Sequence, residues 1–379
     1  MSIHIQDALH GYIELDYEEE AIVDRPELQR LRRIQQLGLS SLVYPSATHT
    51  RFQHSLGVMH TAGRFADSLG INGDRRKELR IAGLLHDSGH GPFSHASEVV
   101  AEKNGFSHEE LSCKVVDELE DEFSVDSGRV KKIINGELEI GRVVAGDIDA
   151  DRMDYLQRDA HATGVEYGQI DAATIIRLAE IDSRRLVFDY KGVQALESLL
   201  TARFHMLKSV YLHNACKIAE KMLERALENY VEENKVKHMM KMDDYEAHTE
   251  LRRFENESGL YTKVSNRKLY KKALSLDSDS LSRETLKEFS EKSEQKLETE
   301  ISEEAGLERN QVIVDLPSVP GSTDLNVRVK KEGEIRPMAD LSPIPDALTE
   351  AEWQLVNLNV YCPETHRSKV SQIAKDIIL

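Results

Sequence analysis

The feature that most constrains this chain is an apolar helical run that ends in a His-Asp pair and a turn. From Lys77 to His86 (KELRIAGLLH) apolar residues recur at intervals of three and four, the period of a helix with one buried face. Two glycines and a proline follow at once (DSGHGP), and such residues end helices. We therefore expect His86 and Asp87 to lie where a buried helix meets a cavity.

Four residues of metal-binding types occur in order along the chain: His54, His86, Asp87 and Asp151. His54 comes three residues after Arg51 in RFQHSLGVMH, so the two share one face of a helix. Two imidazoles and two carboxylates can bind a divalent cation such as Mn, Fe, Mg, Ni or Zn and leave positions for water or phosphate oxygens. Because such a cation polarises a phosphoryl oxygen and lowers the pKa of water, the set predicts phosphoester hydrolysis.

Motifs that would assign another chemistry fail at required positions. Ser94 stands where a dinucleotide-binding GxGxxG loop needs glycine, and the sequence has no GxxxxGK[ST] phosphate loop. His108 and Glu109 continue as ELS, so the HExxH pattern of zinc proteases is missing. Arg152 and Arg158 occupy the glycine and glutamate positions of a calcium loop, which excludes that reading of the acidic residues around them.

Composition and charge limit the cellular compartment and the binding partners that we expect for this protein. A net charge of −18 disfavours non-specific binding of nucleic acid, although a local group of cations can still bind a polyanionic substrate. Cys113, Cys216 and Cys362 form no CxxC pair, which is typical of thiols in a reducing compartment. The sequence shows no signal peptide and no apolar run of about 18 residues, so we expect a cytoplasmic protein without a membrane segment.

The pattern along the chain predicts three segments and a mainly α fold. Residues 1–235 are expected to be mostly helical, including one long run from about Gln194 to Asn229 without an interior proline or glycine. A short extended piece from Arg185 to Tyr190 predicts a small hairpin or an edge strand. Residues 236–309 are rich in Lys, Glu, Ser and Asp, which predicts solvent-facing helices.

The last segment, residues 310–379, is expected to form a small α/β lobe. Gln311–Leu316 (QVIVDL) and Trp353–Tyr361 (WQLVNLNVY) have the composition of strands, and residues 365–379 that of a helix. A turn-rich connection between them contains Pro317, Pro320 and Gly321.

Several longer strings occur together in a fixed order: HGYIELD, VDRPELQRLRRIQQLG, RFQHSLGV, LLHDSGHGPFSH, FSHEE, IDADRMDYLQRD and ARFHMLKSVY. In these strings the chain resembles the HD-domain dNTP triphosphohydrolases, strongly from about His10 to Tyr230 and more weakly through the C-terminal lobe. The resemblance implies an HD-domain helical core with a smaller C-terminal α/β lobe, without a sterile-alpha-motif domain ahead of it. It also implies a homodimer or a homotetramer.

The resemblance assigns roles around the His-Asp pair. His54, His86, Asp87 and Asp151 would be the metal ligands. His95 would face the scissile α-phosphate. Proton transfer would be assisted by His90, together with Glu98 or with His108 and Glu109.

The substrate-binding residues follow from the same resemblance. Arg51, Arg152 and Arg203 would hold phosphate oxygens, and guanidinium groups suit that task because they donate paired hydrogen bonds. The family often has lysine at the position of Arg152, so the charge is kept.

The resemblance also implies how the sugar would be bound. Hydrogen bonds to the 3′-hydroxyl would come from Gln36 and Asp159. Tyr155 and Tyr211 would form a wall beside the sugar. Leu37 and Tyr211 together would leave no room for a 2′-hydroxyl, which would favour deoxynucleotides.

The implied reaction converts a dNTP to deoxynucleoside and inorganic triphosphate. Water attacks the α-phosphorus, the arginines neutralise the developing charge, and a histidine protonates the leaving oxygen. Two alternatives remain open: an HD phosphohydrolase acting on another nucleotide phosphoester, and a catalytically silent nucleotide-sensing oligomer. Analysis of the reaction products distinguishes dNTP hydrolysis from hydrolysis of another phosphoester. Ligand-induced assembly without any product would favour the nucleotide-sensing oligomer.

Regulation by GTP or dGTP is a further implication. The family's guanine-nucleotide activator site uses residue types that are present here as Asp24, Gln29 and Arg32. A second activator site favours basic residues at positions where this chain has Glu180, Asp189 and Asn214. Acidic groups repel a triphosphate, so the resemblance implies activation that is simpler than in the regulated relatives, or absent.

Overall fold

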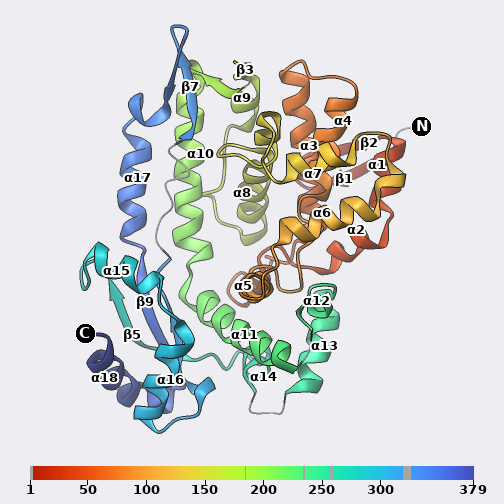
Figure 1. Ribbon diagram of the computed structural model, residues 1–379. Coiled ribbons are helices and arrows are strands. Elements are labelled where there is room, and N and C mark those ends of the chain that lie inside the picture. The colour runs from red at the N-terminus through yellow and green to blue at the C-terminus, as the bar shows by residue number, and fades with distance from the viewer. Residues whose placement is uncertain (1–2, 184, 234, 256–258, 319–325) are drawn as a thin grey trace.

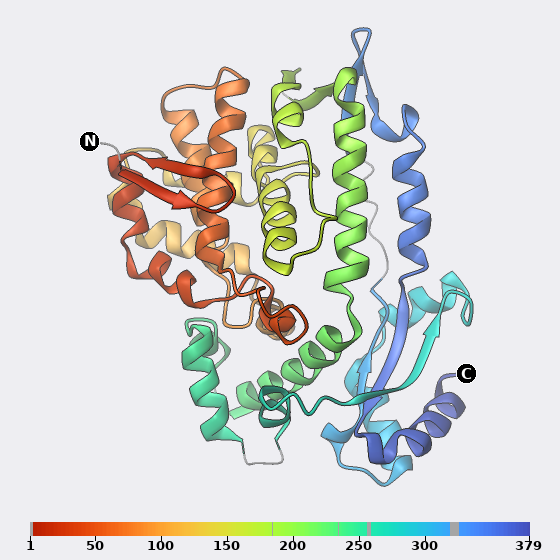
Figure 2. The same ribbon diagram turned by 180° about the vertical axis from the view of Figure 1, so that it is seen from behind.

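The computed structural model describes residues 3–183, 185–233, 235–255, 259–318 and 326–379. Helices dominate it, as expected, and α/β structure is concentrated near the C-terminus (Figures 1 and 2). The centre of the first half is a pair of long helices, α3 (Arg51–Ser68) and α4 (Asp74–Leu85), with α8 (Ala150–Thr163) against the other side of α3.

Close packing of α3 on α4 depends on small residues. A Cβ atom on Gly83 of α4 would lie 3.1 Å from the backbone nitrogen of Met59 in α3. The apolar residues that predicted α4 are buried, among them Leu79, Leu84 and Leu85. The helix ends at Leu85 with His86 as its C-cap, so the predicted position of the His-Asp pair at the end of a buried helix is confirmed.

Shorter elements surround these helices. An antiparallel hairpin of β1 (Ile3–Asp7) and β2 (Gly11–Leu15), which the helical expectation for residues 1–235 did not include, opens the chain. The remaining helices before residue 178 are α1 (Tyr17–Val23), α2 (Pro26–Arg30), α5 (His95–Lys103), α6 (His108–Glu118), α7 (Ser127–Ile134) and α9 (Ala172–Arg177).

The long run expected from Gln194 to Asn229 is divided into two helices. It consists of α10 (Val193–Met206), a π-helical turn over Leu207–Tyr211, and α11 (Asn214–Glu233). The wider π turn changes the direction of the chain without needing proline or glycine, so composition gave no sign of it.

The hairpin expected at residues 185–190 is confirmed, but its second strand is not at an edge. β3 (Ala179–Asp182) pairs antiparallel with β4 (Arg185–Asp189), and β4 pairs parallel with β7 (Arg328–Lys331). Strand β8 (Glu334–Pro337) completes this four-stranded sheet. The following helix α17 (Ile344–Trp353) packs along α10 (Figure 1).

The C-terminal lobe is built on a three-stranded antiparallel sheet in the order β5-β9-β6. Its strands are β5 (Lys271–Asp277), β6 (Ile313–Asp315) and β9 (Asn357–Cys362), and α16 (Glu294–Ala305) and α18 (Arg367–Ile378) pack on it. The strand predicted over Gln311–Leu316 and the closing helix are thus confirmed.

One strand prediction in this lobe has the wrong start. Trp353 ends helix α17, and the strand begins only at Asn357. The indole of Trp353 packs against Leu286 and Val356. Trp353 is therefore apolar because the end of α17 is buried, and not because it belongs to the strand. Of the predicted turn-rich connection, Pro320 and Gly321 lie outside the described residues.

The charged segment contributes the helices α12 (Val236–Met239), α13 (Asp244–Phe254), α14 (Leu260–Ser265) and α15 (Arg283–Ser290), together with α16 and β5. Since β5 shares a sheet with strands that follow residue 310, the divisions at residues 235 and 309 stay predictions.

Candidate active site

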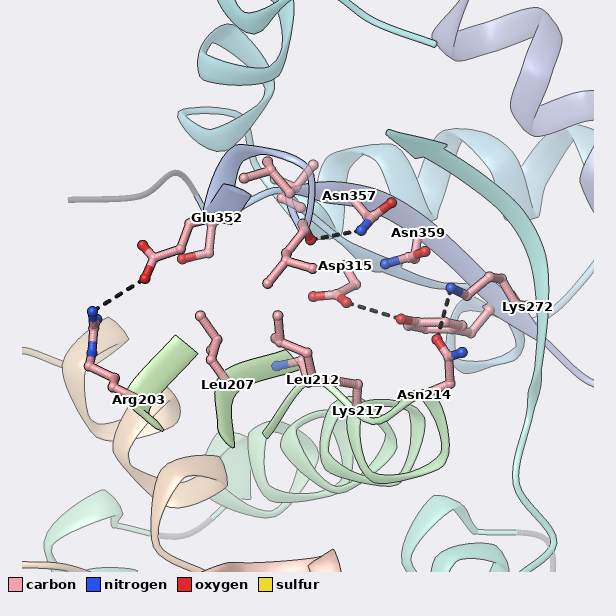
Figure 3. Close-up of a pocket in the computed structure, with 15 residues that line it drawn as sticks. Arg203, Leu207, Leu212, Asn214, Lys217, Lys272, Asp315, Glu352, Asn357 and Asn359 are labelled. Atoms are coloured by element: carbon pink, nitrogen blue, oxygen red, sulfur yellow. Dashed lines mark hydrogen bonds and ion pairs between the residues drawn. The ribbon is translucent and has the colours of Figure 1, made fainter. Parts of the chain in front are cut away.

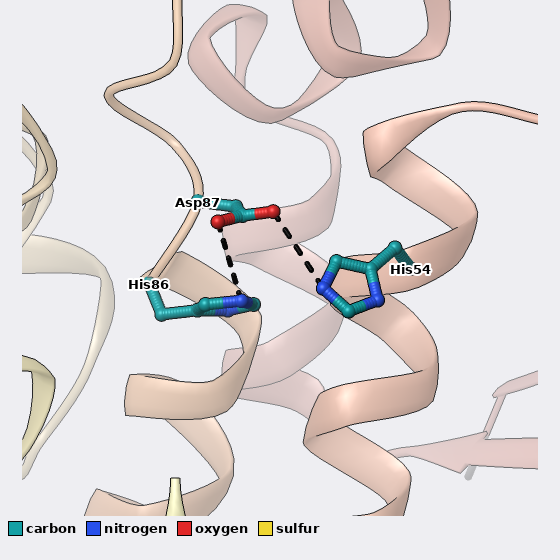
Figure 4. Close-up of side chains that lie close together, drawn as sticks. All are labelled: His54, His86 and Asp87. Carbon is teal, nitrogen blue, oxygen red and sulfur yellow. Dashed lines mark ion pairs between the residues drawn. The ribbon is translucent and has the colours of Figure 1, made fainter. Parts of the chain in front are cut away.

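The four predicted metal ligands converge between α3, the end of α4 and the start of α8. Nε2 of His54 lies 3.6 Å from Oδ2 of Asp87, and Nε2 of His86 lies 3.3 Å from Oδ1 of the same carboxylate (Figure 4). Oδ1 of Asp151 lies 2.8 Å from Nε2 of His54 and 3.7 Å from Nε2 of His86. The ligand atoms of His54, His86 and Asp87 therefore lie within 4.8 Å of one another, and Asp151 reaches the two histidines from the side of α8.

Each histidine is held by its other ring nitrogen. Nδ1 of His86 donates to the carbonyl of Gly83 at 2.8 Å, and Nδ1 of His54 donates to Asp154 at 2.9 Å. These bonds fix the tautomer in which Nε2 carries the lone pair, which is the arrangement found behind metal-bound histidines.

The short contact between His54 and Asp151 requires a positive charge between the two side chains. Nε2 of His54 is buried and, in the described part of the chain, has no hydrogen-bond partner, although Oδ1 of Asp151 lies 2.8 Å away. An imidazole lone pair and a carboxylate oxygen at that distance repel each other unless a proton or a cation lies between them. The donor set thus fits a divalent cation, and an N/O set of this kind suits several metals.

Charges at this point shift the pKa values of its members. Burial alone would lower the pKa of His54, but the carboxylates of Asp151 and Asp154 outweigh it and raise that pKa to about 10. Burial would raise the pKa of Asp151, yet His54 and His86 hold it below its usual range. The carboxylates dominate the local field, which favours cation binding.

Behind His54 lies an ion network that sequence reasoning missed. Asp154 accepts from Nε2 of His10 at 2.7 Å and from Arg158 at 2.8 and 2.9 Å, and Arg158 donates to Asp7 at 2.9 Å. Asp154 and Arg158 stand three and seven residues after Asp151, on the same face of α8, and that spacing was the available signal.

The turn that follows the His-Asp pair is conformationally strained. Phe93 and Ser94 have φ angles of 59° and 49°, in the left-handed region that residues other than glycine rarely adopt. Hydrogen bonds hold the turn: the Ser94 hydroxyl accepts from Nε of Arg51 at 2.9 Å and donates to the carbonyl of Gln35 at 2.6 Å, while the Phe93 N–H donates to Asp244 at 2.7 Å. The turn leads directly into α5, whose N-cap is Ser94.

The predicted catalytic residues form a connected chain of side chains. Nε2 of His90 lies 3.3 Å from Oδ1 of Asp87, and its ring stacks on His108 with centroids 4.1 Å apart. Nδ1 of His108 bonds one oxygen of Glu98, and the other oxygen lies 3.3 Å from Nδ1 of His95. The chain therefore runs from a buried carboxylate to His95, whose side chain is 62% exposed.

The members of this chain differ in protonation. Burial, with Arg51 nearby, lowers the pKa of His90 to about 3, so its imidazole is neutral at pH 7. Burial would also lower the pKa of His108, but the Glu98 carboxylate outweighs it and raises that pKa. Glu109, the other predicted member, has a carboxylate oxygen 3.5 Å from Nε2 of His108.

The three predicted phosphate arginines are differently placed. Arg51 is 3% exposed and donates from Nη1 to Asp87 at 2.6 Å, directly at the metal-ligand candidates. Arg152, at the start of α8, donates to the carbonyl of Asp147 at 2.6 Å. Nη1 of Arg203 lies 3.3 Å from a carboxylate oxygen of Glu352 in α17, which draws it toward the C-terminal half.

Most of the predicted sugar-binding residues lie around Tyr211. Its hydroxyl donates to Asp159 at 2.8 Å, and the rings of Tyr155 and Tyr211 have centroids 6.4 Å apart. Oε1 of Gln36 is buried without a hydrogen-bond partner among the described residues, so an acceptor is left for a ligand hydroxyl. Leu37 and Tyr211 line one cavity.

His49, which sequence reasoning did not select, completes this group. Its Nε2 bonds Oδ1 of Asp159 at 2.7 Å and the ring is 9% exposed. Its place immediately before the helix that carries Arg51 was the only signal.

The predicted activator residues are on the surface near the start of the chain. Arg32 donates from Nε to Gln29 at 2.8 Å, and its guanidinium lies 3.6 Å from the centroid of Phe52. Asp24 is exposed at the end of α1.

The residues predicted to oppose a second activator lie elsewhere. Glu180 pairs with Lys330 at 3.3 Å within the four-stranded sheet, and Asp189 accepts from the N–H of Lys191. Asn214 accepts from Lys272 at 3.0 Å on the other side of the molecule.

The general expectations on cysteines and membranes can also be compared with the structure. Cys113, Cys216 and Cys362 are free thiols. Within the described ranges, no helix combines the length and the hydropathy that crossing a bilayer requires.

The fold and the site define a class of protein. A His-Asp pair at the end of a buried helix, joined by a histidine and an aspartate from two neighbouring helices, is the arrangement of the HD-domain phosphohydrolases. Residues 51–159 match the HD domain, and residues 170–379 match the HD associated region, which is more than half of the chain. The chain belongs to the family of HD-domain proteins that carry this associated region.

Individual relatives agree with this assignment. An uncharacterised protein of Methanocaldococcus jannaschii is 37% identical over 371 residues, which cover 95% of this chain and 79% of that protein. The deoxynucleoside triphosphate triphosphohydrolase SAMHD1 homolog of Dictyostelium discoideum is 34% identical over 248 residues, which cover 59% of this chain and 48% of the relative. The chain therefore matches about half the length of that enzyme.

A solved structure supports the fold over the whole chain. The crystal structure of a phosphohydrolase from Bacteroides thetaiotaomicron superimposes with a TM-score of 0.77 at 28% identity, and the match covers 96% of this chain and 100% of that one. The predicted resemblance to the HD-domain dNTP triphosphohydrolases is confirmed.

Proposed function

We propose that this protein hydrolyses deoxynucleoside triphosphates to deoxynucleoside and inorganic triphosphate with the help of a divalent metal. The observation that carries the proposal is the group of His54, His86 and Asp87, which Asp151 joins through its contacts to both histidines, with the outer nitrogen of each histidine already bonded. These four residues would hold the cation. A divalent cation supplies Lewis acidity there, because it polarises a phosphoryl oxygen and lowers the pKa of water.

The protein's own side chains supply charge and protons. Arg51 donates to Asp87 and so points its guanidinium at the place where phosphate oxygens gather, where it neutralises the charge that develops at the α-phosphorus. Water attacks the α-phosphorus, the bond from phosphorus to the 5′-oxygen breaks, and the leaving oxygen takes a proton. His95 is suited to give that proton, because it is exposed and Glu98 orients its ring.

Sugar selection rests on the residues around Tyr211. Gln36 offers an unpaired buried acceptor for the 3′-hydroxyl, and Asp159 lies beside Tyr211 in the same group. Leu37 and Tyr211 face one cavity, so a 2′-hydroxyl would meet a leucine side chain and a tyrosine ring. A preference for deoxynucleotides follows from that loss of space and of hydrogen bonding.

A pair of variants tests this proposal. Asp87→Ala removes a ligand and the partner of Arg51, so both metal retention and dNTP turnover are expected to fall to background. Asp121→Ala, exposed in the 3₁₀ helix Glu120–Glu122, is the matched control and keeps both. Metal content is measured by elemental analysis and turnover by chromatography of the products. Full turnover in Asp87→Ala would contradict the proposal.

We also propose that the protein works as a homodimer or homotetramer and that a guanine nucleotide binds at Asp24, Gln29 and Arg32. The support is the family assignment and the exposed group in which Arg32 and Gln29 are already bonded to each other. A second activator triphosphate is disfavoured by the acidic side chains of Glu180 and Asp189.

A further inference from the structure

A second cavity adjoins the proposed sugar site. Its volume is about 320 Å³, and it lies between the α10–α11 junction and the C-terminal lobe (Figure 3). The neighbouring cavity that contains Leu37, His95 and Tyr211 shares lining residues with it, among them Leu212 and Asp315. We call the second space the C-lobe cavity. Because Leu212 follows Tyr211 and lines both cavities, a nucleotide whose sugar lay against Tyr211 could extend its base toward the C-lobe cavity.

One side of the C-lobe cavity is apolar. Leu207 and Leu212, at the two ends of the π-helical turn, point into it across from the C-terminal strands (Figure 3). Leu355 and Val356 add to the apolar lining. Such a surface suits the face of a planar ring, and polar groups at the rim then recognise the ring by its edge.

The opposite side carries hydrogen-bonding groups from the C-terminal lobe. Asp315 of β6 accepts from the hydroxyl of Tyr361 at 3.0 Å through Oδ2, while Oδ1 turns toward the cavity and lies 3.6 Å from Nζ of Lys221 (Figure 3). Asn359 accepts from Ser275 at 2.8 Å through its oxygen, which turns its amide nitrogen to the cavity side (Figure 3).

A cation completes this polar edge. Lys272 of β5 donates to Asn214 at 3.0 Å, and both side chains line the cavity (Figure 3). The polar lining thus presents the Asp315 carboxylate together with three donors, the ammonium groups of Lys272 and Lys217 and the Asn359 amide. All of these groups except Asn214 and Lys217, which belong to α11, come from the C-terminal lobe.

We propose that the C-lobe cavity is a base-recognition site for guanine, and this proposal rests on the proposed dNTP hydrolysis. Guanine has two adjacent N–H donors, at N1 and at the 2-amino group, which Asp315 can accept. Its O6 and N7 are two adjacent acceptors, and lysine and amide donors suit them. The C-terminal lobe would therefore select the base, while the helical core carries out the hydrolysis.

Other bases match this edge less well. Adenine has an amino group at position 6, which would face the ammonium of Lys272 with a donor. Cytosine and thymine have one ring and leave part of the space empty. Since a site built to hydrogen-bond a group discriminates against the analogue that lacks it, the preference is expected to be measurable in kcat/KM.

A substrate analogue provides the first test. Deoxyinosine triphosphate differs from dGTP only by lacking the 2-amino group that Asp315 is proposed to accept. The kcat/KM for dGTP is expected to exceed those for deoxyinosine triphosphate and dCTP by about tenfold each, the worth of one good contact to a base edge. Equal values for dGTP, dCTP, dATP and deoxyinosine triphosphate would overturn the proposal and leave the hydrolase function standing.

A pair of lysine variants provides the second test. Lys272→Met is expected to lower the ratio of kcat/KM for dGTP to that for dCTP by about tenfold. Lys271→Met, the exposed neighbour on the other face of β5, is the matched control and keeps the ratio. An unchanged ratio in Lys272→Met would contradict the assignment of the cavity.

The two proposals can fail separately. If no dNTP is hydrolysed, the proposed function fails, and calorimetric binding of unhydrolysed dGTP and dCTP still decides on the cavity. Tighter binding of dGTP that is lost in Lys272→Met would support the base site, whereas equal binding of the two nucleotides would overturn it.

Discussion

At the scale of single residues, the metal-ligand candidates depend on groups that do not touch the metal position. Asp154 holds Nδ1 of His54, and Arg158 and His10 bond the same carboxylate, so the orientation of one ligand rests on a buried network. Close packing adds to this, because a Cβ atom on Gly57 of α3 would lie 1.8 Å from Oδ1 of Asp154. The structure therefore leaves no room for a side chain at position 57.

Asp154→Asn tests this orienting role. Losing the carboxylate behind a ligand histidine is expected to lower metal affinity by about 10- to 100-fold. The melting temperature should fall as well, because buried Arg158 loses one of its two carboxylate partners. Mn²⁺ titration by calorimetry measures the affinity, with Asp121→Asn as the surface control. Unchanged Mn²⁺ affinity would show that Asp154 has only a structural role.

At the scale of elements, a buried ion network joins α11 to the C-terminal lobe. Arg225 of α11 donates to Glu294 and to Glu298 of α16, at 2.8 and 2.7 Å, and Lys221 lies 3.2 Å from Glu294. Burial would raise the pKa of Glu294, but Lys221 and Arg225 outweigh it and lower that pKa to about 2. The lobe that forms the C-lobe cavity is therefore fixed to the core partly by charge.

This network predicts a pH dependence of stability. A carboxyl group whose pKa falls on folding contributes stability above its unfolded value, near 4.5, and loses it as pH falls toward about 2. Glu294→Gln is expected to lower the free energy of unfolding by ~2 to 3 kcal/mol at pH 7. The difference from the unsubstituted protein should shrink between pH 5 and pH 3.

Urea denaturation at pH 7, 5 and 3.5 measures this difference. Glu300→Gln, which is exposed on the same helix, is the control and should leave stability unchanged. If Glu294→Gln destabilised the protein equally at all three pH values, the electrostatic account of this interface would be wrong.

The sequence predicted some of these elements better than others. The period of three and four residues predicted α4 and placed His86 at its end, since burial of one helix face is a local pattern. The π turn that ends at Tyr211 was not predictable, because it depends on tertiary packing, and the bond from Tyr211 to Asp159 joins residues far apart in the sequence. For the same reason the C-lobe cavity could not be predicted: β5 and β6 meet at β9 only in the fold.

At the scale of the whole molecule, the C-terminal half is not a separate attachment to the helical core. Strand β7 pairs with β4, helix α17 packs along α10, and Glu352 of α17 lies 3.3 Å from Arg203 of α10. One residue predicted to bind phosphate is therefore held by the region that forms the C-lobe cavity. Binding of a nucleotide is expected to involve both halves.

The proposed assembly and activation can be measured on the intact protein. Light scattering after gel filtration is expected to give a dimer or tetramer, and GTP is expected to raise dNTP turnover through Asp24, Gln29 and Arg32. The substitution Arg32→Glu should abolish the GTP effect while basal turnover persists. A monomer that turns over dNTP equally with and without GTP would remove the regulatory proposal.

The most direct test of the central claim is product analysis in ¹⁸O-labelled water, with purified protein, Mn²⁺ or Mg²⁺, and each dNTP in turn, with and without GTP. Attack on the α-phosphorus predicts deoxynucleoside without label and inorganic triphosphate carrying one ¹⁸O atom, both identified by chromatography and mass spectrometry. Deoxynucleoside mono- or diphosphate as the product, or label in the deoxynucleoside, would contradict that reaction.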